Sequence, residues 1–199
     1  AHGLVRQQLW ELEAKVSTAK SVSITLSPTD LTHPLWPQGL TCQLIITLTH
    51  DHLEVKLLSH NKGEKPVPLS CALHSYFAID DLQETSLIGI TGEYSDNANE
   101  GAIGSTPETY RFTGEVDRIH PNTDNILSTD IYHKDRPITA ITHAGHDSLV
   151  VWNPWRNKSQ SFVDFADDEY LQMICVETAL TQHFELAPHN HHHLIQTIA

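Results

Sequence analysis

The fold is decided by the stretch Gln43-Leu44-Ile45-Ile46-Thr47-Leu48-Thr49-His50-Asp51-His52-Leu53-Glu54-Val55-Lys56-Leu57. Its apolar residues fall mainly at even positions as far as Leu48, and after a polar turn they return at every second position from Leu53. An alternation with a period of two places the apolar side chains on one face of a strand. We therefore expect two antiparallel strands joined by a short turn.

Alternating or β-branched runs recur along the rest of the chain. They are Ser21 to Leu26, Val67 to Ile79, Ser86 to Thr91, Ile138 to Thr142, Ser148 to Asn153, Leu171 to Glu177 and Leu194 to Ile198. Two other segments, Leu9 to Ala19 and Phe162 to Tyr170, are compatible with a helix, although Trp10 and the run from Val16 to Thr18 favour a strand for the first. We predict an all-β fold built as a sandwich or a barrel, because one open sheet would leave a face and two edges exposed.

The chain shows no internal repeat and no low-complexity linker. The stretch from Tyr94 to Glu108 combines Gly, Pro, Ser and Asn, which is typical of a loop. We therefore predict a single domain over residues 1–199.

Charge and composition exclude several classes of protein. The chain has twelve Lys and Arg and twenty-five Asp and Glu, which gives a net charge of −13. Its cations are scattered along the sequence, so they are unsuited to binding a nucleic-acid backbone. No apolar run approaches the length of a membrane span, and the N-terminal residues do not resemble a signal peptide. Three widely spaced cysteines predict neither a disulfide framework nor a zinc site. A cytoplasmic protein fits these features.

Fifteen histidines suggest a metal, and four of them fall between His189 and His193. Neighbouring residues on a strand point to opposite faces, so such a run does not converge on one ion. We interpret this run as an exposed polar turn before the terminal strand and expect no functional metal site.

Two titratable residues stand out within apolar runs. His74 lies within Cys71-Ala72-Leu73-His74-Ser75-Tyr76-Phe77, where it is either a hydrogen-bonded core histidine or a group facing a cleft. Glu177 ends Met173-Ile174-Cys175-Val176-Glu177, and it is either an exposed strand-end carboxylate or a buried one with a raised pKa, as a general base near neutral pH requires. Together they suggest an acid/base pair but name no reaction.

Six short blocks in this order and spacing resemble the glucose-6-phosphate 1-epimerase branch of the aldose 1-epimerases, the hexose-6-phosphate mutarotases. The blocks are His2-Gly3-x-x-Arg6-x-x-x-Trp10, Leu35-Trp36-Pro37, Leu73-His74-Ser75-Tyr76-Phe77, Asp117-Arg118, Val151-Trp152-Asn153-Pro154-Trp155 and Cys175-Val176-Glu177-Thr178-Ala179. The resemblance runs from Ala1 to the C-terminus and implies a galactose-mutarotase-like β-sandwich with one open face for a sugar.

Two departures accompany this resemblance. Family members have further strands before the His-Gly-x-x-Arg block, including a Gly-rich segment with another arginine, so we expect a sandwich that lacks its N-terminal strands. His189 stands where the family commonly has glycine, and we expect a rearranged loop there.

The resemblance also implies an activity and the residues that carry it. The chain would interconvert the α and β anomers of a hexose 6-phosphate, with glucose 6-phosphate as the expected substrate, Glu177 as the base on O1 and His74 as the acid on O5. Arg6 would bind the 6-phosphate and Asp117 the sugar hydroxyls. Without the resemblance, Arg6 reads as a surface residue paired with Glu11 or Glu13, and Asp117 as a turn-stabilising residue.

We expect no cofactor, a small-molecule sugar phosphate as the ligand, and a monomer that binds neither nucleic acid nor a membrane. The tryptophans Trp36, Trp152 and Trp155 offer faces to a pyranose but are more typical of packing. Two other classes stay open: a non-catalytic carbohydrate-binding β-sandwich, and a metal-dependent cupin-like barrel built on the histidines, whose activity a chelator would abolish.

Overall fold

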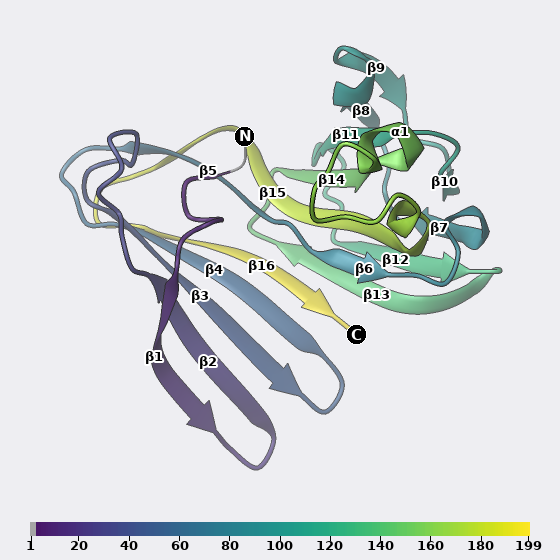
Figure 1. The fold of residues 1–199 in the computed structure, drawn as a ribbon. Coiled ribbons are helices and arrows are strands. Elements are labelled where there is room, and N and C mark those ends of the chain that lie inside the picture. Colours follow the sequence, from purple (N-terminus) through teal and green to yellow (C-terminus); the bar gives the residue numbers. More distant parts are fainter. Residues whose placement is uncertain (1–2) are drawn as a thin grey trace.

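The computed structural model describes residues 3–199 and folds them into two antiparallel β-sheets (Figure 1). His2, part of the first sequence block, lies outside the described residues. The larger sheet has nine strands in the order β1-β2-β3-β4-β16-β13-β12-β7-β10. The smaller sheet has the order β5-β15-β14-β11-β8-β9, and β6 pairs with β15 beside β5. The predicted all-β fold with two layers is confirmed.

The nine-stranded sheet contains β1 (Trp10–Ser17), β2 (Ser21–Pro28), β3 (Leu40–Thr49), β4 (Leu53–Asn61), β7 (Thr85–Ile88), β10 (Tyr110–Arg111), β12 (Ser128–His133), β13 (Arg136–Ala144) and β16 (His191–Ile198). The seven-stranded sheet contains β5 (Val67–Leu73), β6 (Tyr76–Ala78), β8 (Glu93–Asp96), β9 (Ala102–Ser105), β11 (Val116–Pro121), β14 (Ser148–Asn153) and β15 (Met173–Leu186). The helical elements of the described chain are η1 (Leu82–Glu84), η2 (Asn97–Asn99), α1 (Trp155–Ser159) and η3 (Glu169–Gln172).

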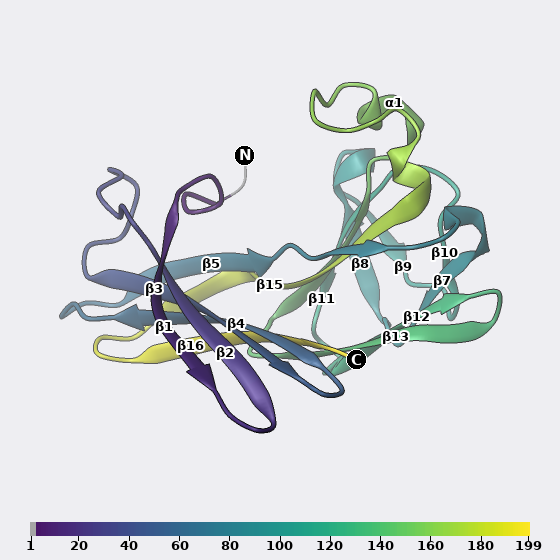
Figure 2. The same cartoon turned by 60° about the horizontal axis from the view of Figure 1, so that its bottom comes forward.

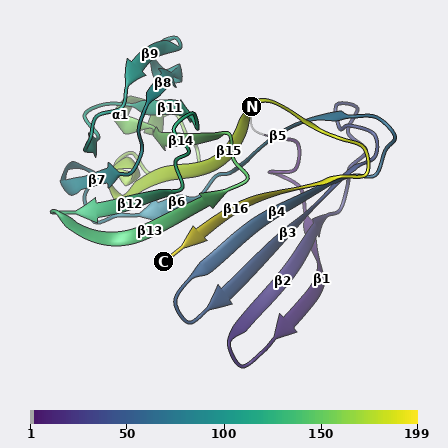
Figure 3. The same ribbon diagram turned by 180° about the vertical axis from the view of Figure 1, so that it is seen from behind.

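The hairpin predicted from the opening stretch is formed by β3 and β4. Leu48 pairs with Leu53 next to the turn, and Leu44 pairs with Leu57 further along. The C-terminal strand β16 then lies between β4 and β13, so it joins the first four strands to the rest of the sheet (Figure 3). A residue near the middle of β16 therefore lies well inside the larger sheet.

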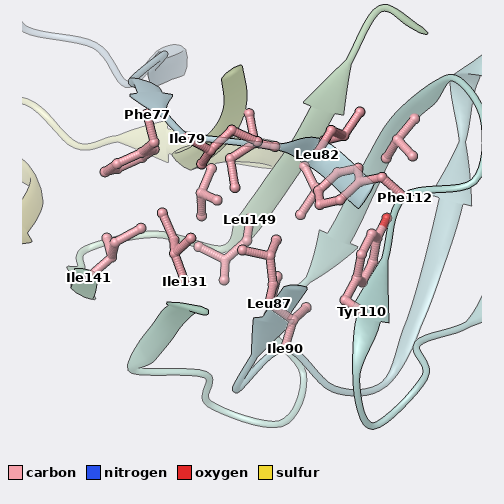
Figure 4. Close-up of a cluster of buried hydrophobic side chains, with 14 of the residues drawn as sticks. Phe77, Ile79, Leu82, Leu87, Ile90, Tyr110, Phe112, Ile131, Ile141 and Leu149 are labelled. Carbon is pink, nitrogen blue, oxygen red and sulfur yellow. The ribbon is translucent and has the colours of Figure 1, made fainter. Parts of the chain in front are cut away.

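A cluster of buried aliphatic and aromatic side chains fills the space between the sheets (Figure 4). Leu87 and Ile131 come from the larger sheet, Leu149 and Ile174 from the smaller one, and all four are at most 1% exposed. A second cluster, which includes Leu40, packs β5 and the far end of β15 on β3, β4 and β16. These clusters fix how the strands of the two sheets lie against each other.

The strands β1, β2 and β3 extend away from the smaller sheet (Figures 1 and 2). Leu12 on β1, Val22 on β2 and Leu48 on β3 are 60%, 41% and 57% exposed. The strand β1 also forms one edge of the larger sheet. Among residues 3–199, no helix is long and apolar enough to cross a membrane.

Residues 162–170, which are compatible with a helix by sequence, form no continuous helix, since only the short η3 overlaps their end. Two local predictions were wrong. The stretch from Tyr94 to Glu108 contains most of β8 and all of β9 rather than a loop alone. The histidine run is not wholly a turn either, because β16 begins at His191 and pairs with β4. His189 has φ = 58°, in the left-handed region that favours glycine.

Candidate active site

One face of the smaller sheet carries the residues that the sequence singled out. Asp117 on β11 pairs with Trp152 on β14, and Trp152 pairs with Cys175 on β15. Because side chains alternate along a strand, Glu177, two residues after Cys175 on β15, lies on the same face as Cys175. The intervening Val176 points to the opposite, core face, where it is fully buried.

An interruption between β5 and β6 brings His74 next to Glu177. The sequence predicts one strand from Val67 to Ile79, but the structure leaves His74 and Ser75 outside the strands, and the Ser75 N–H donates to the Leu73 carbonyl. On β15, Thr178 pairs with Leu73 before the break and Cys175 with Tyr76 after it. Glu177 is therefore opposite the break, and His74 Nε2 lies 3.3 Å from Glu177 Oε1.

Burial perturbs the carboxyl group of Glu177. The residue is 6% exposed, and loss of solvation is the main cause that raises its pKa from 4.5 to about 8. The negative charge of Asp117 contributes to this rise, whereas the positive charge of Arg6 opposes it. A carboxyl group with a pKa near neutrality is suited to accept and return a proton.

Aromatic rings surround this pair. The ring of Tyr76 stacks on the His74 imidazole with centroids 4.9 Å apart, and Trp152 meets His74 edge-on at 5.9 Å. Of the other tryptophans, Trp155 packs against the main core cluster and Trp36 packs against the second cluster. Stacked rings hold the imidazole in one orientation and leave an apolar surface beside it.

Asp117 belongs to a polar group at the side of the cleft. Its Oδ1 accepts a hydrogen bond of 3.2 Å from Asn97 Nδ2, and its Oδ2 lies 3.9 Å from Lys158 Nζ. Lys158 Nζ also donates to Glu115 Oε1 at 2.8 Å. Asn97 and Lys158 were not predicted from the sequence, since they come from the short η2 and α1 and no sequence block includes them.

Arg6 is exposed at the opening of the cleft. Burial raises the pKa values of Tyr76 and Glu177, and the positive charge of the nearby Arg6 opposes both shifts. Its proposed surface pairing with Glu11 or Glu13 is not among the ion pairs of the described residues. Arg6 is thus a cation available to a ligand that reaches the base.

All four predicted site residues line one cleft of about 1060 Å³. Its wall also includes Trp36, Trp152 and Lys158. This volume suits a small molecule, and its wall combines apolar rings with convergent polar groups. The arrangement supplies a proton acceptor, a proton donor and a cation around one space.

Two substitutions test the electrostatics of the site directly. We expect Asp117→Asn to lower the pKa of Glu177, because a neighbouring negative charge is removed, and Arg6→Met to raise it, because a positive charge is removed. Carbon-13 NMR titration of the side-chain carboxyl groups measures both shifts, with the Glu177 signal assigned by its loss in Glu177→Gln. Shifts of the same sign in both variants would contradict this geometry.

The two antiparallel sheets, with His74 and Glu177 together on one face, form a galactose-mutarotase-like fold. The family profile described as aldose 1-epimerase matches residues 1–198, so the chain belongs to the aldose 1-epimerase family. The resemblance noted from the sequence blocks is confirmed.

Proteins named "Putative glucose-6-phosphate 1-epimerase" are similar to this chain. The one from Escherichia coli K12 is 29% identical over 188 residues, and the one from Cenchrus ciliaris is 26% identical over 193 residues. These alignments cover 90% and 91% of this chain but 60% and 58% of the relatives. The chain thus spans about three fifths of the length of these relatives.

A solved structure shows the same fold. The crystal structure of a "putative mutarotase" from Salmonella typhimurium superposes with a TM-score of 0.84 at 26% identity, covering 96% of this chain and 64% of that one. A galactose mutarotase-like protein from Clostridium acetobutylicum has a TM-score of 0.68 at 12% identity over 100% of this chain and 68% of that one, which extends the likeness in fold.

Proposed function

We propose that the chain interconverts the α and β anomers of a hexose 6-phosphate, with glucose 6-phosphate as the preferred substrate. The observation that carries the proposal is the contact of 3.3 Å between His74 Nε2 and Glu177 Oε1 in the cleft. The names of the relatives support the same reaction class.

The reaction needs two proton transfers at neighbouring oxygens. Glu177 as the carboxylate removes the proton from the O1 hydroxyl, while protonated His74 delivers a proton to the ring oxygen O5. The C1–O5 bond breaks, an aldehyde forms at C1, and rotation about C1–C2 exposes its other face. Closure reverses both transfers: the O5 hydroxyl returns its proton to His74 as O5 attacks C1, and O1 takes the proton from Glu177. The steps are proton transfers and one reversible bond cleavage, so the proposal includes no cofactor.

The geometry of the pair suits this sequence because O1 and O5 are bonded to the same carbon. An acid and a base that serve them must therefore lie next to each other, within hydrogen-bond reach of one centre. Glu177 lies on the buried part of β15, and His74 packs against the rings of Tyr76 and Trp152, so packing restrains both side chains. The carboxylate form of Glu177 becomes fully populated as the pH rises past about 8.

Asp117 and Arg6 complete the proposed substrate site. The carboxylate of Asp117, already held by Asn97, would accept hydrogen bonds from sugar hydroxyls. The guanidinium of Arg6 would bind the 6-phosphate at the cleft opening. We further propose a monomeric, cytoplasmic protein that binds neither nucleic acid nor a membrane, and its three free cysteines fit a reducing compartment.

Exchange NMR on equilibrated glucose 6-phosphate tests the function. Cross-peaks between the α and β anomeric protons should strengthen when the protein is added, relative to a matched sample without protein, and a chelator should have no effect. If the protein does not accelerate the exchange of the anomers, the proposed enzymatic activity is refuted. Shifts or broadening of the sugar signals without acceleration would instead support the non-catalytic carbohydrate-binding sandwich.

Arg6→Met tests the phosphate contact. We expect the ratio of kcat/KM for glucose 6-phosphate over glucose to fall roughly 10- to 100-fold, the usual worth of a hydrogen bond to a charged group. A ratio cancels any effect of the substitution on the pKa of Glu177, because both substrates use the same base. Arg136→Met, at an exposed arginine on β13, is the matched control and should leave the ratio unchanged. A ratio equal to the parent's in Arg6→Met would remove Arg6 from the phosphate site.

A further inference from the structure

A buried amide crosses from the larger sheet to the strand that carries Glu177. Gln196 lies on β16, is 0% exposed and faces the smaller sheet. Its Nε2 donates to the Val176 carbonyl at 2.9 Å and to Thr178 Oγ1 at 3.0 Å. Its Oε1 accepts a hydrogen bond from the Ser75 hydroxyl. One side chain therefore bonds to two residues of β15 and to Ser75 in the break between β5 and β6.

The orientation of this amide is determined by its partners. The Val176 carbonyl has no hydrogen to donate, so Nε2 rather than Oε1 faces it. Both hydrogens of Nε2 are then used, and the remaining oxygen takes the Ser75 hydroxyl proton. Every polar atom of the Gln196 side chain has a partner in this single arrangement.

The same chain of hydrogen bonds continues deeper into the core. Thr178 Oγ1, which accepts from Gln196, also lies within hydrogen-bond distance of His143 Nδ1, at 2.7 Å. His143 Nε2 lies 3.3 Å from Thr129 Oγ1. Burial lowers the pKa of His143 to about 3, so the imidazole is neutral and one of its two nitrogens donates while the other accepts. The hydrogen-bonded network therefore extends from Ser75 through Gln196 to Thr129.

The three contacts of Gln196 flank the two candidate catalytic residues in the sequence. Val176 and Thr178 precede and follow Glu177, and Ser75 follows His74. We infer that Gln196 is a positioning residue that fixes the separation of His74 and Glu177 from behind, through Ser75 on one side and the β15 backbone on the other. The expected effect of Gln196 on kcat rests on the proposed function. Its expected effect on the distance between His74 and Glu177 rests on the contacts alone.

The position of the amide explains why this role would matter. Between Leu73 and Tyr76 the ladder of β15 is interrupted, so the backbone next to His74 lacks the regular strand pairing that holds its neighbours. The Ser75 hydroxyl bond to Gln196 replaces that pairing with one side-chain contact. An acid and a base that serve one centre tolerate little displacement, since a shift of about 1 Å can cost on the order of 100-fold in rate.

Gln196→Met tests the inference, because methionine has a similar length and no hydrogen-bonding group. We expect kcat for glucose 6-phosphate to fall roughly 10- to 100-fold with little change in KM, since the substrate contacts at Asp117 and Arg6 are untouched. Asn61→Leu is the matched control. Asn61 is also a 0% exposed amide that donates to β15, but at the Leu186 carbonyl, and its variant should keep the kcat of the parent.

Ser75 provides a second, milder variant if Gln196→Met does not fold. Ser75→Ala removes only the bond on the His74 side and should lower kcat, whereas Ser75→Thr keeps the hydroxyl and should restore part of it. A general loss of packing would not distinguish these two residues in this way. A folded Gln196→Met or Ser75→Ala protein with the kcat of the parent would overturn the inference.

Crystal structures separate this inference from the proposed function. The distance between His74 Nε2 and Glu177 Oε1 should lengthen in Gln196→Met and in Ser75→Ala, and stay at its parent value in Asn61→Leu. If the parent chain fails to accelerate anomer exchange, the proposed function fails and the distances alone decide the inference. An unchanged distance in folded Gln196→Met or Ser75→Ala would reject Gln196 as a positioning residue whether or not the parent is active.

Discussion

Glu177→Gln is expected to lower kcat for anomer exchange of glucose 6-phosphate by about 10²- to 10⁴-fold, the usual contribution of a positioned general base. Glutamine keeps the size and shape of the side chain but does not take the O1 proton. KM should change much less, because the proposed binding groups are Asp117 and Arg6. Exchange NMR at saturating substrate measures the rate, and a fall of less than about tenfold would contradict the role of Glu177 as the base.

The same substitution should stabilise the folded protein at high pH. The pKa of Glu177 is about 8 when folded and 4.5 as its ordinary value, so between these values the folded state binds more protons than the unfolded state. The stability of the parent therefore falls as the pH rises through this window, and the loss is complete above about pH 8. Glutamine carries no charge and avoids this loss.

Urea unfolding of the parent and of Glu177→Gln at pH 5 and pH 9 measures this effect. We expect the variant to have the higher free energy of unfolding at pH 9, by up to a few kcal/mol, and the difference to shrink at pH 5. A parent that is at least as stable as the variant at pH 9 would show that the carboxylate is stabilised by its surroundings. Lower activity together with higher stability is the result expected when a buried carboxylate serves catalysis but its charge lowers the stability of the folded protein.

Alternation in the sequence predicted the strands whose apolar residues repeat every second position. The hairpin of β3 and β4 is the clearest case, since it combines this repeat with a polar turn. The strands β8 and β9 were not predicted, because they are only four residues long, show no clear alternation of apolar and polar residues and lie next to or contain glycine. Their stability comes from pairing with each other and with β11, which a local pattern does not reveal.

The site shows the same division between local and long-range information. A histidine in an apolar run and a glutamate at the end of another were visible as anomalies, because burying a titratable group is costly. Their approach to 3.3 Å depends on the break after Leu73 and on the register of β15 against β5 and β6. Gln196 is separated from Ser75 by 121 positions, so nothing in either local sequence signals their hydrogen bond.

His74→Gln is expected to lower kcat by about the same 10²- to 10⁴-fold, since glutamine has no proton that it can release to O5 at neutral pH. Trp152, Asp117 and Arg6 still line the cleft in this variant, so substrate binding should change little. Exchange NMR at saturating substrate again measures the rate. A histidine that only packs in the core would leave the rate of the folded variant near that of the parent.

The double variant His74→Gln/Glu177→Gln distinguishes one catalytic unit from two independent groups. Independent contributions would multiply, so the double variant would be slower than either single variant by a further 10²- to 10⁴-fold or so. If ring opening needs the acid and the base together, the first substitution removes most of the catalysis and the second adds little, as in other sites whose residues act as a unit. The contact of 3.3 Å between the two groups favours the second outcome, because each side chain lies within reach of the single centre that the other serves. Multiplicative losses would mean that His74 and Glu177 act in separate steps, and the proposed mechanism would then fail.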